Sequence, residues 1–213
     1  MSALKKFSIT GPTGNLEGIA HVPDDAPRAI AVVAHPLPTA GGTMDNKVAM
    51  TLAKTFAELE CAVFRFNFRG VGASEGEFTG GDGEEQDLLA VVQYAREQFG
   101  EDLPLILAGF SFGGYVAARA AQLLHPQHLI LAAPAVGRFT KDTMPTKKMP
   151  DVSANTLVIH GENDELVPLA AALAWASPQH LPIVVLPQTD HYFHRRLAQL
   201  RTIVLQHFQG VAL

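Results

Sequence analysis

Short apolar segments alternate with longer amphipathic ones along this chain. Residues 29–34 are continuously apolar, without the alternation of a half-exposed strand, and so predict a strand covered on both faces of a largely parallel sheet. Further strands of this kind are predicted at 62–66, 103–108, 129–132, 156–159 and 183–186. Helical spacing between them predicts crossover helices at 46–59, 84–99, 113–124, 168–176 and 192–208.

The beginning of the chain has a different pattern. Residues 7–10 and 16–20 are strand-like and are separated by Gly-Pro-Thr-Gly-Asn, a composition that favours a turn, so they predict a short antiparallel hairpin. Residues 137–150 are polar and predict a loop or a rudimentary cap, too short for a large lid. The expected fold is one α/β domain over residues 1–213, with a mostly parallel central sheet flanked by helices.

Composition narrows the function classes. Hydrophobic residues make up 47% of the chain and charged residues 17%, which is too apolar for disorder, and no apolar run is long enough to span a bilayer. The net charge of −5 argues against a nucleic-acid partner, and the first residues lack a hydrophobic signal core. We therefore expect a cytoplasmic protein that binds neither membrane nor nucleic acid. A dimer is possible, and the single cysteine, Cys61, is expected to be buried and structural.

The strongest chemical motif follows the predicted strand 103–108. Gly109-Phe110-Ser111-Phe112-Gly113 fits the pattern GxSxG and precedes a predicted helix. A sharp strand-to-helix turn exposes the serine hydroxyl, while the small residues on either side let strand and helix pass. This context favours Ser111 as a nucleophile over an ordinary Gly-Ser turn.

A serine nucleophile needs a base and an acid that orients the base. Asp164 follows the predicted strand 156–159 and His191 follows the strand 183–186, so both would lie at the same sheet edge as Ser111. The sequence therefore predicts a Ser111–His191–Asp164 triad in the chain order of this topology. Helix capping is the alternative role for Asp164, with Glu162 or Glu165 as the acid in its place.

Two other histidines have competing interpretations. His194 and His191 together form a weak metal half-site, or both are surface residues, and no further ligands complete a zinc site. His160 ends a predicted strand and is expected to form a structural hydrogen bond.

Two backbone amides are candidates for an oxyanion hole. The Phe112 amide would lie at a helix N-terminus next to the nucleophile. The Leu37 amide lies between Pro36 and Pro38, which have no amide hydrogen, in the turn after the strand 29–34. The alternative is a proline-rich turn without a catalytic role, capped by Asp45 or Asn46 before the next helix.

Together these motifs resemble the α/β-hydrolase superfamily, close to small lidless dienelactone-hydrolase-like proteins and bacterial serine esterases. The resemblance covers nearly the whole chain. It rests on the serine turn, the Asp164 and His191 loops, and two glycine-containing segments, 35–47 and 67–76. Ser111 stands where dienelactone hydrolases have cysteine, and Asn67 stands where many relatives have aspartate. Residues 69–76 are expected to shape a turn beside the pocket.

The resemblance covers esterases, thioesterases, peptidases, haloperoxidase-like enzymes and inactive relatives. The residues favour a serine hydrolase that cleaves a carboxylic ester or thioester of a small-molecule acyl substrate through an acyl-enzyme, without a metal or organic cofactor. A dehalogenase would need a carboxylate at position 111. A non-catalytic binding or scaffold protein with this fold is the alternative. Five side chains are candidates for pocket walls or for the core: Phe78, Phe110, Phe112, Met144 and Phe193.

Overall fold

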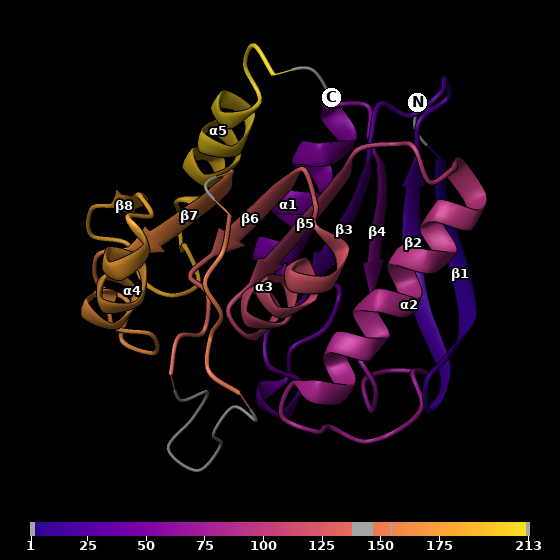
Figure 1. Ribbon diagram of the computed structural model, residues 1–213, viewed down its shortest axis with the longest axis horizontal. Coiled ribbons are helices and arrows are strands. Elements are labelled where there is room, and N and C mark those ends of the chain that lie inside the picture. Colours follow the sequence, from indigo (N-terminus) through magenta and orange to yellow (C-terminus); the bar gives the residue numbers. More distant parts are fainter. Residues whose placement is uncertain (1–2, 138–146, 154, 212–213) are drawn as a thin grey trace.

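A computed structural model describes residues 3–137, 147–153 and 155–211. Eight strands form one sheet in the order β1-β2-β4-β3-β5-β6-β7-β8 (Figure 1). The strands are β1 Ala3–Gly11, β2 Gly14–Val22, β3 Ile30–Ala34, β4 Ala62–Phe66, β5 Leu105–Phe110, β6 His128–Ala132, β7 Thr156–Gly161 and β8 Ile183–Leu186. The pairs β1–β2 and β2–β4 are antiparallel and the others are parallel. The mostly parallel sheet and the N-terminal hairpin are thus confirmed.

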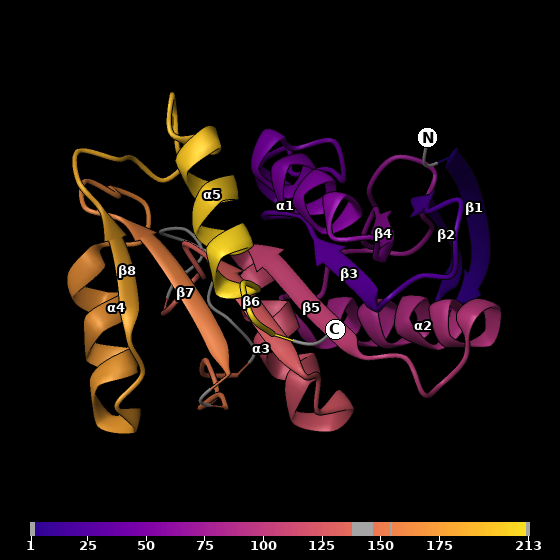
Figure 2. The same cartoon turned by 90° about the horizontal axis from the view of Figure 1, so that it is seen from above.

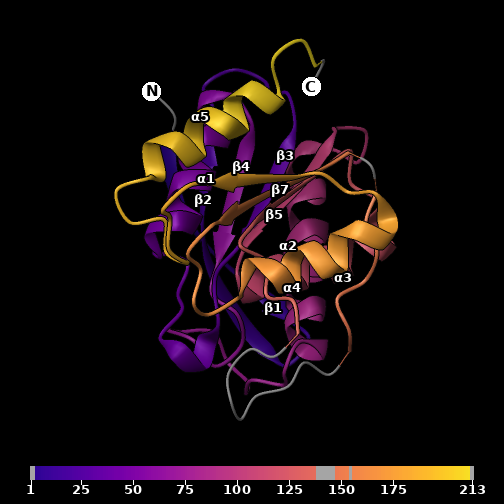
Figure 3. The same cartoon turned by 90° about the vertical axis from the view of Figure 1, so that its left-hand side faces the viewer.

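Helices cover both faces of this sheet. Its helices are α1 Lys47–Glu58, α2 Asp82–Phe99, α3 Phe112–Leu124, α4 Leu169–Ala176 and α5 Leu197–His207. Figure 2 shows α1 and α5 on one face and α2 and α3 on the other, and Figure 3 shows α4 on the side of α3. No helix in the described ranges is long and apolar enough to cross a membrane.

Strand β3 shows how the sequence produces two cores. Its apolar side chains alternate between the faces: Ile30 and Val32 pack with residues of α2 and α3, whereas Ala31 and Val33 pack with residues of α1 and α5. All of these positions are buried because β3 lies between β4 and β5 and has helices on both sides. A continuously apolar segment is the expected sequence of such a strand.

The last predicted helix is wrong at its start. We expected a helix from residue 192 to 208, but α5 begins only at Leu197, and the chain before it forms turns. Phe193 and Arg195 have positive φ angles of 53° and 61°, which a right-handed helix does not allow. The buried side chain of Phe193 instead packs into the core on the α1 and α5 face. These turns place His191 in a loop rather than at a helix N-terminus.

Two short 3₁₀ helices complete the described elements, Pro38–Ala40 after β3 and Ser177–Gln179 after α4. The other strands and helices lie within two residues of their predicted bounds at each end, except that β1 begins four residues earlier than expected. A loop or rudimentary cap is expected at residues 137–150, and most of this polar segment lies outside the described residues.

Candidate active site

Ser111 occupies the sharp turn between β5 and α3. Its φ of 55° and ψ of −118° are strained for a residue with a side chain, at a cost of about 1–3 kcal/mol. Three backbone hydrogen bonds hold this conformation. The Ser111 amide donates to the Ala132 carbonyl at 3.0 Å, and the Ser111 carbonyl accepts from the amides of Ala135 at 3.0 Å and Tyr115 at 3.2 Å. The turn is therefore fixed to the neighbouring strand and to the helix that follows.

The two glycines of the GxSxG motif are required by close backbone packing. A Cβ atom at Gly109 would lie 2.2 Å from the Gly113 carbonyl oxygen, and one at Gly113 would lie 2.3 Å from the Ala34 carbonyl oxygen. Both distances are far below van der Waals contact with rigid backbone. The second contact brings the N-terminus of α3 against the end of β3, where the Leu37 turn begins.

The three residues predicted as a triad lie in one hydrogen-bonded line. His191 Nε2 is 2.9 Å from Ser111 Oγ, and His191 Nδ1 is 2.7 Å from Asp164 Oδ2. Because the carboxylate is an acceptor, Nδ1 carries the proton and Nε2 can accept the proton of the serine hydroxyl. Asp164 and His191 are buried, while Ser111 is partly exposed. The arrangement can therefore deliver a proton from an accessible hydroxyl to a protected imidazole.

Backbone contacts join the two loops that carry the acid and the histidine. The Glu162 amide donates to the Leu186 carbonyl at 3.0 Å, and the Asn163 amide donates to the Thr189 carbonyl at 2.9 Å. A Cβ atom at Gly161 would lie 2.4 Å from the same Thr189 oxygen. The ends of β7 and β8 are thus held at a fixed separation, which sets the distance between Asp164 and His191.

Asp164 rather than a neighbouring glutamate faces the histidine. Its Oδ1 atom accepts from the amides of Leu166 at 2.9 Å and Val167 at 2.7 Å, so it also organises the turn before α4. Glu162 is exposed, and its Oε2 accepts from the Gln188 amide at 2.9 Å. Glu165 is exposed as well. Asp164 thus faces the histidine, but it does not cap a helix: the N-cap of α4 is Pro168, and none of the described side chains caps this helix.

Neither His194 nor His160 forms the hydrogen bond to Ser111. His194 Nδ1 lies 2.7 Å from Asp190 Oδ2 on the surface, and its ring is not directed at the Ser111 line. His160 is buried and its Nε2 lies 2.8 Å from the Val167 carbonyl oxygen, which agrees with a structural hydrogen bond. Among the described residues no group of three or more histidine, cysteine, aspartate or glutamate side chains is arranged to hold a metal ion.

The Leu37 turn is built as a rigid loop above the nucleophile. The Leu37 carbonyl accepts from the amides of Ala40 at 3.1 Å and Gly42 at 3.0 Å, whereas the Leu37 amide donates to no residue that the structure describes. A Cβ atom at Gly42 would lie 2.1 Å from the Pro36 oxygen, so the loop closes tightly on itself. Asn46 caps α1 through bonds to Val48 and Ala49, as the alternative for this turn anticipated. The Leu37 amide is available as a donor because none of the described residues accepts from it.

His35 fixes the orientation of this turn. Its Nδ1 lies 2.7 Å from the Pro36 carbonyl oxygen, and its Nε2 accepts from the Phe68 amide at 3.0 Å. The imidazole is thus a neutral Nδ1–H tautomer. Burial lowers the pKa of His35 to about 4, although the bond to Pro36 opposes the shift. We had not assigned a role to this residue. The sequence signal for this role of His35 is its position directly before the turn.

Residues 69–76 form a turn, as expected, and Asn67 stands just before it. Asn67 Oδ1 accepts from the Met44 amide at 2.8 Å, while its Nδ2 donates to Glu17 Oε1 at 2.7 Å. An aspartate at this position would face the Glu17 carboxylate without a proton to donate. Asparagine is therefore suited to this chain at the position where many relatives carry aspartate.

A buried ion pair that we had not anticipated supports the same turn. Arg69 Nη2 lies 2.6 Å from Asp87 Oδ1, and the Arg69 amide and Nε also donate to this carboxylate. The sequence held a signal for this pair. Glu84 lies three and four residues before Asp87 and Leu88, and Asp87 lies four residues before Val91, so all four share one face of α2. Leu88 and Val91 are buried, so two acidic residues occupy the face of the helix that contacts the core.

The aromatic candidates for pocket walls serve mostly the core. Phe110, Phe112 and Phe193 are fully buried. Phe78 is half-buried and packs on Phe112 with ring centroids 5.4 Å apart. Met144 lies outside the described residues. An unexpected aromatic neighbour is Tyr192, which is exposed and packs edge-on against His191 at 5.3 Å.

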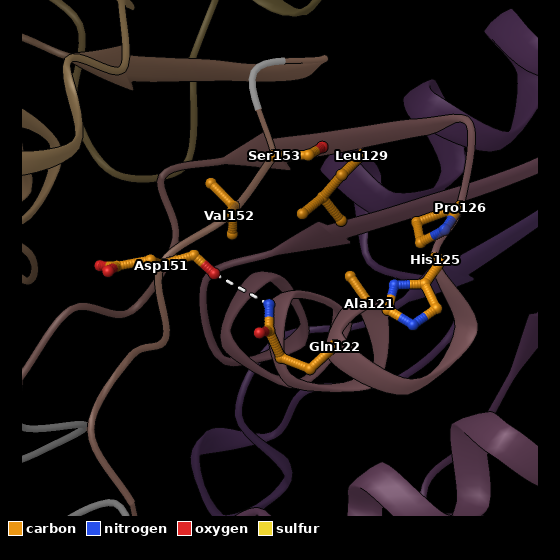
Figure 4. Close-up of a pocket in the computed structure, with 8 residues that line it drawn as sticks. All are labelled: Ala121, Gln122, His125, Pro126, Leu129, Asp151, Val152 and Ser153. Atoms are coloured by element: carbon orange, nitrogen blue, oxygen red, sulfur yellow. Dashed lines mark hydrogen bonds between the residues drawn. The ribbon is translucent and has the colours of Figure 1, made fainter.

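A separate cavity of about 390 Å³ lies away from this site. It is lined by residues at the end of α3, the start of β6 and the segment before β7: Ala121, Gln122, His125, Pro126, Leu129, Asp151, Val152 and Ser153. Figure 4 shows Gln122 bonded across it to Asp151, whose carbonyl oxygen accepts at 2.8 Å. Because α3 begins directly after Ser111 and the cavity lies at the other end of this helix, the cavity is not part of the candidate active site.

Comparison with known proteins agrees with the geometry. A family model described as an alpha/beta hydrolase domain matches residues 27–210. A Xanthomonas campestris protein, described as a lidless α/β serine hydrolase, is 41% identical, with a TM-score of 0.86 over 98% of this chain and 94% of that one. An α/β serine hydrolase homologue from Coxiella burnetii is 35% identical, with a TM-score of 0.83 over 95% and 96%.

A curated sequence adds a further relative. The Rickettsia prowazekii protein RP471 is 30% identical over 173 residues, which cover 77% of this chain and 68% of that protein. The family model, the two structures and the serine turn between β5 and α3 all point to the same superfamily. The chain belongs to the α/β hydrolases, and the two solved structures named above are described as an α/β serine hydrolase and a homologue of one.

Proposed function

We propose that this protein hydrolyses carboxylic esters or thioesters of small acyl substrates through a Ser111–His191–Asp164 triad. The observation that carries the proposal is the continuous line of hydrogen bonds from Ser111 Oγ through His191 to Asp164, with lengths of 2.9 and 2.7 Å. It begins at a strained, accessible serine and ends at a buried carboxylate. This is the arrangement required to activate a weak nucleophile at neutral pH.

The reaction proceeds in two balanced steps. Ser111 Oγ attacks the acyl carbon while its proton passes to His191 Nε2, and the tetrahedral intermediate then collapses as His191 returns the proton to the departing alcohol or thiol. The acyl group is now esterified to Ser111. Water attacks this acyl-enzyme while giving a proton to His191, and His191 returns that proton to Ser111 Oγ as the intermediate collapses and releases the carboxylic acid. Asp164 keeps the imidazole oriented and stabilises its positive charge throughout.

Two amides are assigned to the negative oxygen of each intermediate. The Phe112 amide is at the N-terminus of α3, directly after the nucleophile, and the Leu37 amide lies in the rigid turn that His35 orients. Gly113 packs against the end of β3, so the two segments are neighbours. Losing one such donor costs on the order of 3–4 kcal/mol of transition-state stabilisation in comparable enzymes.

A fluorophosphonate probe tests the proposal, because it reacts covalently with activated serines. Wild-type protein should be labelled stoichiometrically, and Ser111→Ala should not be labelled while remaining folded by circular dichroism. A panel of esters and thioesters of increasing acyl length should show turnover that depends on Ser111. Equal, weak labelling of both proteins, together with no Ser111-dependent turnover, would instead support a non-catalytic binding protein with this fold.

A further inference from the structure

His160 is a buried histidine that the proposed mechanism does not use. It is the second-last residue of β7, four residues before Asp164, and its side chain has no exposed surface. Its Nε2 atom lies 2.8 Å from the Val167 carbonyl oxygen and 3.5 Å from Asp164 Oδ2. A second imidazole therefore lies beside the same carboxylate oxygen that His191 contacts.

The protonation of this ring follows from its neighbours. Both groups near Nε2 are acceptors, a carbonyl oxygen and a carboxylate oxygen, so Nε2 must carry a proton. Nδ1 is buried and has no hydrogen-bond partner among the described residues, so nothing there stabilises a second proton. Burial is also the largest influence on the pKa of His160 and lowers it, although Val167 and Asp164 oppose the shift and the neighbouring His191 adds to it. His160 is thus a neutral Nε2–H donor.

This donor closes a ring of interactions around Asp164. The Val167 amide donates to Asp164 Oδ1 at 2.7 Å, and the Val167 carbonyl accepts from His160. Val167 is therefore bonded on both sides of its backbone, once to the carboxylate and once to the strand that precedes it. The Asp164 side chain cannot rotate away from His191 without breaking one of these bonds.

We propose that His160 is a positioning residue that holds the Asp164 carboxylate against His191, by donating its Nε2–H to the Val167 carbonyl and so fixing the Val167 backbone, whose amide binds Asp164. The assignment rests on the proposed function of the triad. It differs from a purely structural bond because it connects β7, through Val167, to Oδ1 of the carboxylate whose other oxygen contacts His191.

Two substitutions at residue 160 distinguish a positioning role of the His160 side chain from a role in packing. His160→Gln places an amide N–H close to the position of Nε2, whereas His160→Leu has a similar volume and no donor. Val158→Ala is the matched control, because Val158 is fully buried in the same strand and belongs to the core rather than to the acid loop. It should lower the thermal midpoint without changing the kinetics of the folded enzyme.

The kinetic experiment measures kcat, KM and the pH profile of kcat/KM on an ester that the wild type hydrolyses. For His160→Leu we expect kcat to fall about ten- to a hundredfold with KM within about twofold, the scale seen when a group that orients a reacting residue is lost. The acidic limb of the profile should move to lower pH, because a displaced carboxylate stabilises the imidazolium less. His160→Gln should recover most of kcat and the wild-type profile.

Two results would overturn the assignment. One is a His160→Leu enzyme whose activity falls only in proportion to its folded fraction, as expected for Val158→Ala, and whose pH profile is unchanged. The other is a His160→Gln enzyme as impaired as His160→Leu.

An NMR measurement separates failure of this inference from failure of the proposed function. The low-field proton of the His191 Nδ1–H bond to Asp164 can be observed without any substrate. It should be present in the wild type and in His160→Gln, and weakened or shifted in His160→Leu. If the wild type shows no Ser111-dependent turnover, the proposed function fails, while this signal still decides whether His160 positions Asp164. An identical signal in all three proteins would refute the positioning role.

Discussion

Two histidine–aspartate pairs with the same separation lie close together in this chain. His191 Nδ1 is 2.7 Å from Asp164 Oδ2, and His194 Nδ1 is 2.7 Å from Asp190 Oδ2. In the first pair the side chains are 5% and 0% exposed, whereas in the second they are 72% and 47% exposed. A hydrogen-bond length therefore does not distinguish a candidate catalytic pair from a surface pair.

The difference lies in how each pair is held. Asp190 and His194 are four residues apart and meet through a local turn, which also brings the His194 amide to Asp190. Asp164 and His191 are 27 residues apart and meet only because β7 and β8 are adjacent in the sheet. Burial then strengthens the interaction, and the free nitrogen of His191 faces Ser111. Four predictions test this distinction, in order of decreasing effect.

The largest effect should come from the carboxylate of the buried pair. Asp164→Asn should lower kcat/KM by about 10⁴-fold, because the amide favours the wrong imidazole tautomer and cannot stabilise the imidazolium. This is close to 5.5 kcal/mol of transition-state stabilisation. Asp190→Asn is the matched control and should change kcat/KM less than about threefold. Similar losses in the two variants would mean that the buried pair has no special role.

The second prediction tests whether every buried ion pair is needed for activity, using the Arg69–Asp87 pair. Asp87→Ala leaves the Arg69 guanidinium buried without its partner, and should reduce the free energy of unfolding by about 3–5 kcal/mol. Urea titration measures this loss, and kcat of the folded fraction should stay close to that of the wild type. The double variant Arg69→Met with Asp87→Leu should be more stable than Asp87→Ala. A large fall in kcat at full folding would show that this pair contributes to the reaction.

The third prediction concerns acid stability. The pKa of His35 is about 4 in the folded protein because the ring is buried, against an ordinary value of 6.5. As pH falls from 6.5 to 4, the unfolded chain binds a proton that the folded protein excludes, so the free energy of unfolding should fall by about 3 kcal/mol. Above pH 6.5 His35 contributes no pH dependence.

Urea titrations between pH 7.5 and 4.5 measure this loss. His35→Gln does not titrate in this range and should have a flatter profile, though from a lower starting stability. His194→Ala should retain the full wild-type slope because its ring is mostly exposed. A wild-type slope in His35→Gln would assign the acid sensitivity to other groups.

The smallest effect should come from the surface histidine itself. His194→Ala should change kcat/KM less than about threefold and the free energy of unfolding by at most about 1 kcal/mol, since exposed pairs contribute little. His191→Ala, assayed in parallel, should lose nearly all turnover. A loss in His194→Ala comparable to that in His191→Ala would require a part for His194 in the site.

The sheet could be predicted from the sequence because strands buried on both faces leave continuous apolar segments. Residues 29–34 and 62–66 are examples, and β3 and β4 lie within one residue of them. The serine turn could be predicted because its steric requirement lies partly within the motif: a Cβ atom at Gly109 would meet the backbone of Gly113. The proximity of Ser111, Asp164 and His191 could be predicted because each follows the end of a parallel strand.

Other features depend on contacts that the local sequence does not display. The partners of Arg69 and Asn67 are Asp87 and Glu17, on a helix and a strand remote from the turn. The late start of α5 follows from the positive φ angles at Phe193 and Arg195, whereas the apolar spacing of this segment is compatible with a longer helix. Such features arise when the tertiary structure outweighs local preference.

The placement of the candidate site along the chain bears on when the proposed activity can first appear during synthesis. The turn that carries Leu37 follows β3, an early strand, but His191 follows β8, the last strand of the sheet. A nascent chain can therefore complete the serine turn and still lack its proposed base until the final strand has left the ribosome and paired with β7. Under the proposed mechanism, acyl transfer has to wait for this last strand pairing.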